Sequence, residues 1–230
     1  MKIIFTILSQ KWPEYILEII VITIGIFGAF TLNNWKETRK NQIFEKEVLT
    51  QIKINLERDR ETLEEIRISF EKAIKSSDKI LQKKQEYSEN DSTKYWLGDI
   101  VQFDRFQPLT NAYEMLKSKG LDNLSNKKLA FLLGQYYDDE VHQAVESIGD
   151  IEVSFTSDWL PLLKTNVKAV KFKEYVVLSD WSVFSERDGS ARILLILNKD
   201  NYNGGLNKIR IAIKSLDDLI QLIDIELTKK

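Results

Sequence analysis

The chain has 230 residues, no cysteine and a formal net charge of −2, with 33 basic and 35 acidic side chains spread along its length. Without cysteine it can form no disulfide, no thiolate metal site and no cysteine nucleophile. Because charges of both signs are mixed and nearly balanced, the sequence indicates no nucleic-acid partner.

An apolar segment near the N-terminus predicts one transmembrane helix. Residues 16–32 read ILEIIVITIGIFGAFTL, with Glu18 as the only charge. A membrane span needs about 20 mostly apolar residues, and aromatic residues flank this segment where a membrane boundary would place them: Trp12, Tyr15 and Trp35. We therefore expect residues 1–35 to form an interfacial segment and a membrane span that contacts the lipid bilayer. A buried core helix and a cleaved signal peptide are the alternatives.

Small residues within this segment predict a helix–helix contact in the membrane. Gly25 and Ala29 are four residues apart, Gly28 lies beside them, and Glu18 precedes Gly25 by seven residues and so falls near the same face. A carboxyl group inside a span is costly unless it is buried between helices or reaches the interface. The pattern predicts a homo-oligomer held by this face. The alternative is an interfacial glutamate that extends to the membrane surface.

Residues 36–230 are expected to form one α-helical domain. The stretch 36–87 lacks proline and glycine, and its apolar residues recur at a helical period: Phe44, Val48, Ile52, Leu56, Leu63, Ile66, Phe70, Ile74 and Leu81. Mixed charges lie between them, as in residues 57–61, and we interpret these charges as a solvated face.

Turn residues divide the middle of this domain. Residues 88–93 predict a polar loop, and a short helix is expected over 111–119, stopped by the glycine that follows it. A longer helix is expected from residue 125 or 126 to about 159, where Pro161 ends or kinks it. Residues 164–190 are interpreted as loop or irregular helix, because a lone strand there would have no partner.

A heptad pattern marks the last element. Apolar residues alternate three and four apart and predict a seam of a helical bundle: Leu206, Ile209, Ile213, Leu216, Ile220, Ile223 and Leu227. The expected partner is the long helix after the membrane span, running antiparallel, which would return the C-terminus towards the membrane. The predicted fold class is therefore all-α, with a single N-terminal transmembrane helix continuing into a long helix of an antiparallel helical bundle.

The chain resembles a family of single-span membrane proteins of Bacteroidota that has no established activity. Two sets of residues carry the resemblance. The first set is Glu18-Ile19, Ile24-Gly25-Ile26, Ala29 and Asn33-Asn34-Trp35-Lys36-Glu37. The second set is Pro108, Ala112-Tyr113-Glu114, Leu116-Lys117-Ser118, Gly120-Leu121, Asn126, Leu129 and Tyr136-Tyr137. The resemblance covers most of the chain and implies the same order of elements.

The predicted location is the cytoplasmic (inner) membrane, with a single pass. Lysines and arginines are more frequent after the span than before it, which by the positive-inside rule places residues 36–230 in the cytoplasm. The resemblance implies a periplasmic domain instead, because members of the family carry a basic N-terminal tail. The side of the membrane stays open, with the periplasm favoured by the resemblance.

We find no catalytic constellation in the sequence and expect no metal site and no cofactor. His142 is the only histidine, residues 138–140 are consecutive acids that diverge around a helix, and Gly204-Gly205 lacks the lysine of a phosphate-binding loop. The predicted function is a membrane-anchored interaction, scaffold or sensory module that binds another copy or another membrane or envelope protein. The alternatives are a subunit of an oligomeric channel or ion-coupled assembly built around Glu18, and a membrane-bound enzyme whose site comes from distant residues.

Overall fold

The computed structural model describes residues 2–82, 92–184 and 189–229, with side chains from Trp12 onward except at positions 13 and 14. The chain divides into two compact units, Met1–Glu47 and Val48–Lys230. The predicted domain boundary, after residue 35, marks the end of the apolar segment, whereas the boundary after Glu47 marks the edge of a compact unit. Among the described residues, Val167–Lys171 (β1) and Tyr175–Leu178 (β2) are the only strands, so the predicted all-α class is confirmed at this level.

The first element, α1, is one α-helix over Lys2–Gln82. The predicted helix over residues 36–87 is confirmed as far as Gln82, and residues 83–87 lie outside the described part. Within the second unit ten buried positions of α1 alternate three and four apart, which is the spacing of a heptad seam: Leu49, Ile52, Leu56, Asp59, Leu63, Ile66, Phe70, Ala73, Ser77 and Ile80. Val48, Asn55 and Ser76 are also buried, each next to a residue of this seam.

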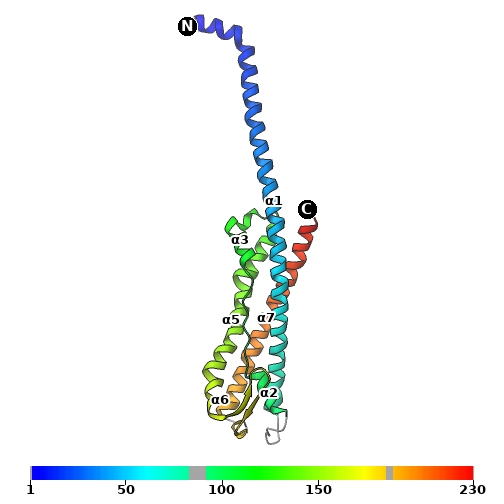
Figure 1. Cartoon of the computed structure of the whole chain (residues 1–230). Coiled ribbons are helices and arrows are strands. Elements are labelled where there is room, and N and C mark those ends of the chain that lie inside the picture. Colours follow the sequence, from blue (N-terminus) through cyan, green and yellow to red (C-terminus); the bar gives the residue numbers. More distant parts are fainter. Residues whose placement is uncertain (1, 83–91, 185–188, 230) are drawn as a thin grey trace. The chain divides into compact units, whose positions relative to one another are not determined.

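The last element, α7, covers Ser190–Thr228 and packs along this part of α1. Contacts between the two helices run in opposite order along them: Lys53 with Asp224, Arg60 with Asp217, Glu71 with Arg210, and Asp78 with Lys199. Within the second unit the helices therefore run antiparallel, as Figure 1 shows. Lys230, at the end of the predicted return of the C-terminus, lies outside the described residues.

Shorter elements fill the space beside α1 and α7. In chain order they are α2 (Thr93–Ile100), α3 (Asn111–Lys119), η1 (Leu121–Asn123), α4 (Lys127–Gln135), the π-helix η2 (Tyr136–Glu140), α5 (Val141–Ser154), the π-helix η3 (Phe155–Trp159), α6 (Leu160–Asn166), β1 (Val167–Lys171), β2 (Tyr175–Leu178) and η4 (Ser182–Phe184). The helix α5 packs on α7, and α4 also contacts α7. The predicted short helix over 111–119 is confirmed as α3.

For the region after α4, one prediction is wrong and another is wrong in one of its two alternatives. Residues 164–190 hold an antiparallel hairpin, in which Val170 pairs with Val176 and Lys171 with Tyr175, rather than loop or irregular helix. The strand over residues 175–178 pairs with β1. The sequence of β1 contains two lysines and has no clear pattern of apolar residues, so it did not suggest a strand. The predicted end of the helix at Pro161 is wrong, since this residue lies in the first turn of α6, directly after the π-helical turn η3, whereas the predicted alternative, a kink, stays a prediction. A first-turn proline loses no hydrogen bond.

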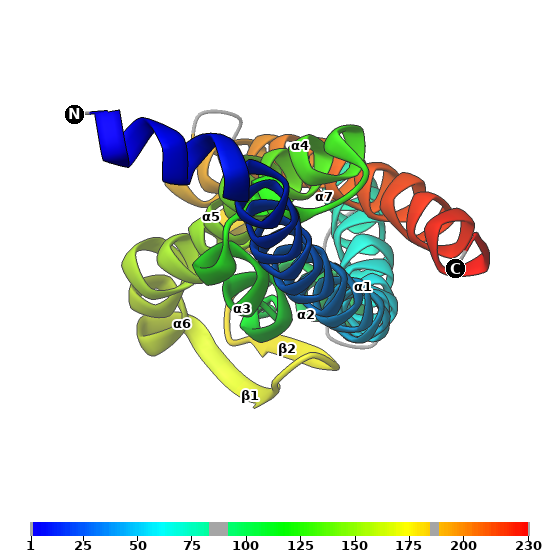
Figure 2. The ribbon, with the colours of Figure 1, turned by 90° about the horizontal axis from the view of Figure 1, so that it is seen from above.

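A glycine allows the hairpin to touch α2. A Cβ atom at Gly98 would lie 2.5 Å from the carbonyl oxygen of Glu174 and 2.7 Å from Cα of Tyr175, closer than any side chain can be tolerated against backbone. Figure 2 shows the hairpin beside α2 and α6. The turn of the hairpin therefore rests directly on the α2 backbone.

Candidate functional site

The apolar N-terminal segment is the first feature of functional interest. It lies in α1, which is long and apolar enough to cross a membrane by length and composition, and none of its most apolar 18-residue window is buried. A core helix of a soluble protein would bury most of such a window. The predicted boundary residues Trp12, Tyr15 and Trp35 are exposed as well. The segment is thus compatible with a membrane anchor, and a signal sequence near the N-terminus would meet the same criteria of length and composition.

The predicted membrane contact face is open in the single chain. Glu18 and Ala29 are exposed, and a Cβ added at Gly25 or Gly28 would meet no atom within 4 Å. Among the described residues of the first unit, no contact explains these small residues.

The buried seam of α7 differs from the predicted one at alternate positions, where it lies one residue earlier in the sequence. Of the predicted residues, Leu206, Ile209, Ile213, Leu216 and Ile223 are buried, whereas Ile220 and Leu227 are only half-buried. Three predicted positions (Ile209, Leu216 and Ile223) belong to the stripe that is buried throughout, and the others flank it. That stripe is Leu195, Asn198, Tyr202, Gly205, Ile209, Ala212, Leu216, Leu219, Ile223 and Glu226. At Gly205 an added Cβ would come within 2.7 Å of the Phe70 ring of α1, so the glycine gives this ring its space.

A buried polar cluster joins α1 to the segment that leads into α3. Asp59 is only 3% exposed, and its carboxylate accepts the backbone N–H of Leu109 at 3.0 Å and 3.3 Å. One turn earlier, Asn55 donates to the carbonyl oxygen of Leu109 at 3.3 Å and to the side chain of Asn111 at 2.7 Å. Two side chains of α1 thus satisfy both backbone groups of one residue that follows Pro108. The interpretation of residues 57–61 as a solvated face is wrong for Asp59.

The charge of Asp59 is poorly compensated. Burial raises the pKa of its carboxyl to about 6, and the bond from the Leu109 N–H only partly opposes this rise. Tyr136 and Tyr137, on the π-helical turn η2, are buried and their hydroxyl groups have no hydrogen-bond partner among the described residues. Burial, and next the charge of Asp59, raises the pKa of both hydroxyls, so both stay protonated.

The same region holds most of the second set of residues on which the family resemblance rests. Tyr113 stacks on Tyr137 with ring centroids 4.4 Å apart, and its hydroxyl donates to Asp138 at 2.9 Å. Lys117 also donates to Asp138, at 2.7 Å, and lowers the pKa of that carboxyl. All three tyrosines are core residues. His142 is exposed, and no group of three or more candidate metal ligands occurs in the described part of the chain.

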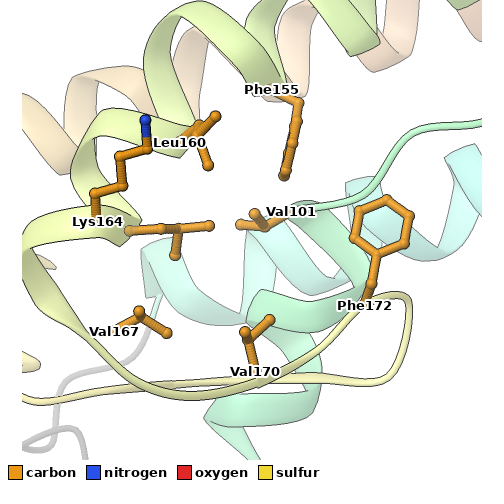
Figure 3. A pocket seen from close by; sticks show the side chains of 8 residues that line it. Val101, Phe155, Leu160, Lys164, Val167, Val170 and Phe172 are labelled. Atoms are coloured by element: carbon orange, nitrogen blue, oxygen red, sulfur yellow. The ribbon is translucent and has the colours of Figure 1, made fainter.

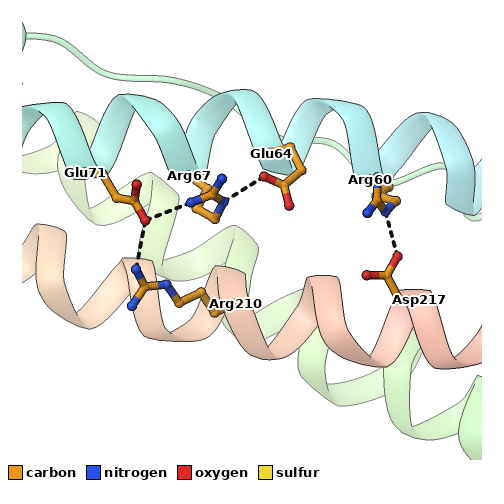
Figure 4. A network of polar contacts seen from close by, with 6 residues as sticks. All are labelled: Arg60, Glu64, Arg67, Glu71, Arg210 and Asp217. Atoms are coloured by element: carbon orange, nitrogen blue, oxygen red, sulfur yellow. Dashed lines mark hydrogen bonds and ion pairs between the residues drawn. The ribbon is translucent and has the colours of Figure 1, made fainter.

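Ion pairs line the contact between α1 and α7. Figure 4 shows Arg67 between Glu64 and Glu71 on α1 (2.7 Å and 2.8 Å), while Glu71 also accepts from Arg210 of α7 at 2.8 Å. The bond from Arg210 lowers the pKa of Glu71. These side chains are partly exposed, so each pair contributes at most about 1 kcal/mol, and only the pair of Arg210 with Glu71, which joins the two helices, helps to fix their register.

An apolar pocket of about 420 Å³ lies where α6, β1 and the end of α2 meet. Its walls consist of Val101, Phe155, Leu160, Leu163, Lys164, Val167, Val170 and Phe172, and Figure 3 shows seven of them with labels. Val101 and Leu163 belong to the buried core, whereas Val170 and Phe172 on the hairpin are 53% and 44% exposed. The sequence analysis did not predict this site, because its residues come from several elements and carry no motif.

No family model, curated protein or solved structure matches this chain. The family resemblance therefore stays a prediction, and function must be inferred from the geometry of the molecule itself.

Proposed function

We propose that the chain is a single-pass membrane protein whose N-terminal helix anchors an antiparallel helical interaction module with no catalysis of its own. One observation carries the proposal: α1 has an apolar window with no buried residue, and the same helix continues into the heptad seam of the helical unit. An unburied apolar stretch of this length is strongly unfavourable in water and favourable in a bilayer.

The proposed location is the cytoplasmic (inner) membrane, with the helical unit on one side of it. The aromatic residues Trp12, Tyr15 and Trp35 support a membrane boundary at each end of the apolar window, since aromatic rings are enriched there. The balance of charges and the family resemblance favour opposite sides, and the proposal holds for either one.

The proposed partner within the membrane is a second copy of the chain. The open face of Gly25, Gly28 and Ala29 supports a close helix–helix contact, and Glu18 near the same face would be buried between the helices. A carboxyl group buried in this way is more favourable than one in contact with lipid. An ion-coupled assembly built around Glu18 is the second candidate that this observation favours.

Single cysteines at Gly25 and Ala29 test both the anchor and the homo-oligomer, because the chain has no native cysteine. In native membranes we expect both variants to resist a membrane-impermeant maleimide, to react with a permeant one and to form disulfide-linked dimers under mild oxidation. A cysteine at Ile211, which is exposed on α7, is the control that should react with the impermeant reagent once its side of the membrane is opened.

The two parts of the proposal fail in different ways. Reaction of Gly25→Cys and Ala29→Cys with the impermeant maleimide in sealed membranes would contradict the anchor. Protection from that reagent without any dimer at either position would contradict the homo-oligomer and leave the anchor standing.

A further inference from the structure

We propose that the pocket beside α6 binds the acyl chain of a long-chain carboxylate, with the carboxylate group at Lys164. This inference goes beyond the proposed anchoring function and concerns a small-molecule ligand of the helical unit. A cavity of about 420 Å³ falls within the range of about 300–1,000 Å³ that is usual for small-molecule sites.

The chemistry of the walls selects the body of the ligand. Apart from Lys164, every residue that lines the pocket has an aliphatic or aromatic side chain. Water in such a space finds no hydrogen-bond partners, whereas an apolar chain that enters it leaves water and gains dispersion contacts. The walls therefore favour a hydrocarbon chain over a polar metabolite.

The position of one charge selects the head group. Lys164 is exposed, and in Figure 3 its side chain extends past Leu160 so that Nζ stands at the edge of the apolar cluster. No acidic residue lines the pocket. A cation at the edge of an apolar pocket attracts a ligand with one apolar end and one anionic end.

The size of the pocket favours one chain over two. At about 30 Å³ for each water-sized group, a volume of about 420 Å³ holds about 14 such groups. That number suits a single acyl chain better than both chains of a phospholipid. The proposed ligand is therefore a free long-chain carboxylate rather than a membrane lipid.

The wall formed by the hairpin is held in place before any ligand arrives. The rings of Phe172 and Phe103 lie 5.3 Å apart, and both pack against Phe155. Lys173 at the turn forms an ion pair with Asp104, and the backbone at Glu174 rests on Gly98. A preformed wall reduces the entropy that ligand binding would otherwise cost.

The test uses the full chain in phosphatidylcholine vesicles and a 16-carbon carboxylic acid that carries a photoreactive diazirine. After illumination we expect adducts on peptides that contain Leu160 or Phe172, in addition to adducts on the apolar part of α1 from probe dissolved in the bilayer. Excess palmitate should suppress the pocket adducts about 2- to 5-fold more strongly than hexadecanol, because an exposed ion pair contributes up to about a factor of five.

Three variants make the test specific, and two of them are the same lysine-to-methionine change at different positions. Lys164→Met should lower the pocket adducts about 2- to 5-fold and remove the preference for palmitate over hexadecanol, while Lys168→Met, the same change four residues later, should leave both unchanged. Val170→Glu should abolish the pocket adducts, since it places a negative charge on an exposed position of the wall.

Adducts on α1 alone would overturn the inference and leave the anchor intact. Equal labelling of the pocket in wild type and Lys164→Met would overturn the role of the carboxylate. Labelling by a photoreactive two-chain phospholipid that palmitate cannot suppress would overturn the choice of a free carboxylate.

Discussion

Replacing Ile209 by alanine is expected to destabilise the helical unit by about 2–5 kcal/mol, because the change leaves a cavity in a seam that cannot close around it. Ile209 has no exposed surface and lies on the stripe by which α7 packs on its neighbours. In a domain of this size each kcal/mol lowers Tm by about 2–4 °C. Thermal unfolding followed by circular dichroism measures the loss.

Ile211→Ala is the matched control for this change. Ile211 lies two residues further along the same helix and is 42% exposed, so its replacement should change stability by no more than about 0.5 kcal/mol. Equal Tm values for Ile209→Ala and Ile211→Ala would contradict the position of the seam.

Replacing Asp59 by asparagine is expected to stabilise the protein above pH 7 by up to about 3 kcal/mol, from about two pKa units at 1.36 kcal/mol each. Burial raises the pKa of Asp59 from 3.8 to about 6, so the folded state binds this proton more tightly than the unfolded state. Stability contributed at Asp59 is therefore present at low pH and lost as the pH rises from about 4 to about 6. Asparagine keeps an oxygen acceptor for the Leu109 N–H and has no charge to bury.

The measurement is the difference in unfolding free energy between Asp59→Asn and wild type from pH 4 to pH 8. We expect a difference near zero at pH 4 that grows in favour of the variant up to about pH 7. Asp138→Asn is the control with the opposite sign, because Lys117 lowers the pKa of Asp138 and its stabilisation is lost as the pH falls. A wild type as stable as Asp59→Asn at pH 8 would contradict the burial of an uncompensated charge.

Elements that are bounded by local chemistry could be predicted from the sequence. The helix α3 ends where expected because Gly120 takes a φ of +93°, a conformation open to glycine at little cost. The helix α4 begins after Asn126, whose side chain accepts the N–H of Leu129 at 3.1 Å. In both cases the residue acts on backbone groups within a few positions of itself.

The register of the α1–α7 seam was harder to predict, because it includes residues that are not large and apolar. Gly205 and Ala212 occupy seam positions. The prediction instead placed the larger residues that follow them, Leu206 and Ile213, in the seam. Asp59 was missed for a similar reason. It completes the heptad between Leu56 and Leu63, but its charge suggested solvent.

The hairpin and the pocket depend on contacts between distant segments. The strand β2 needed β1 as its partner, and the wall of the pocket needed Gly98 to bring the hairpin turn against α2. None of these contacts follows from the spacing of residues within one segment. The candidate site became visible only with the fold.

Extraction of membranes with alkaline carbonate tests the membrane anchor most directly. We expect the full chain to stay in the membrane pellet, and the double variant Ile24→Lys with Phe27→Lys to move to the supernatant, because two lysines near the centre of a span cost about 5–7 kcal/mol. The control pairs Ile193→Lys with Ile196→Lys at two exposed positions of α7 and should stay in the pellet. Release of the wild-type chain into the supernatant would contradict the anchor.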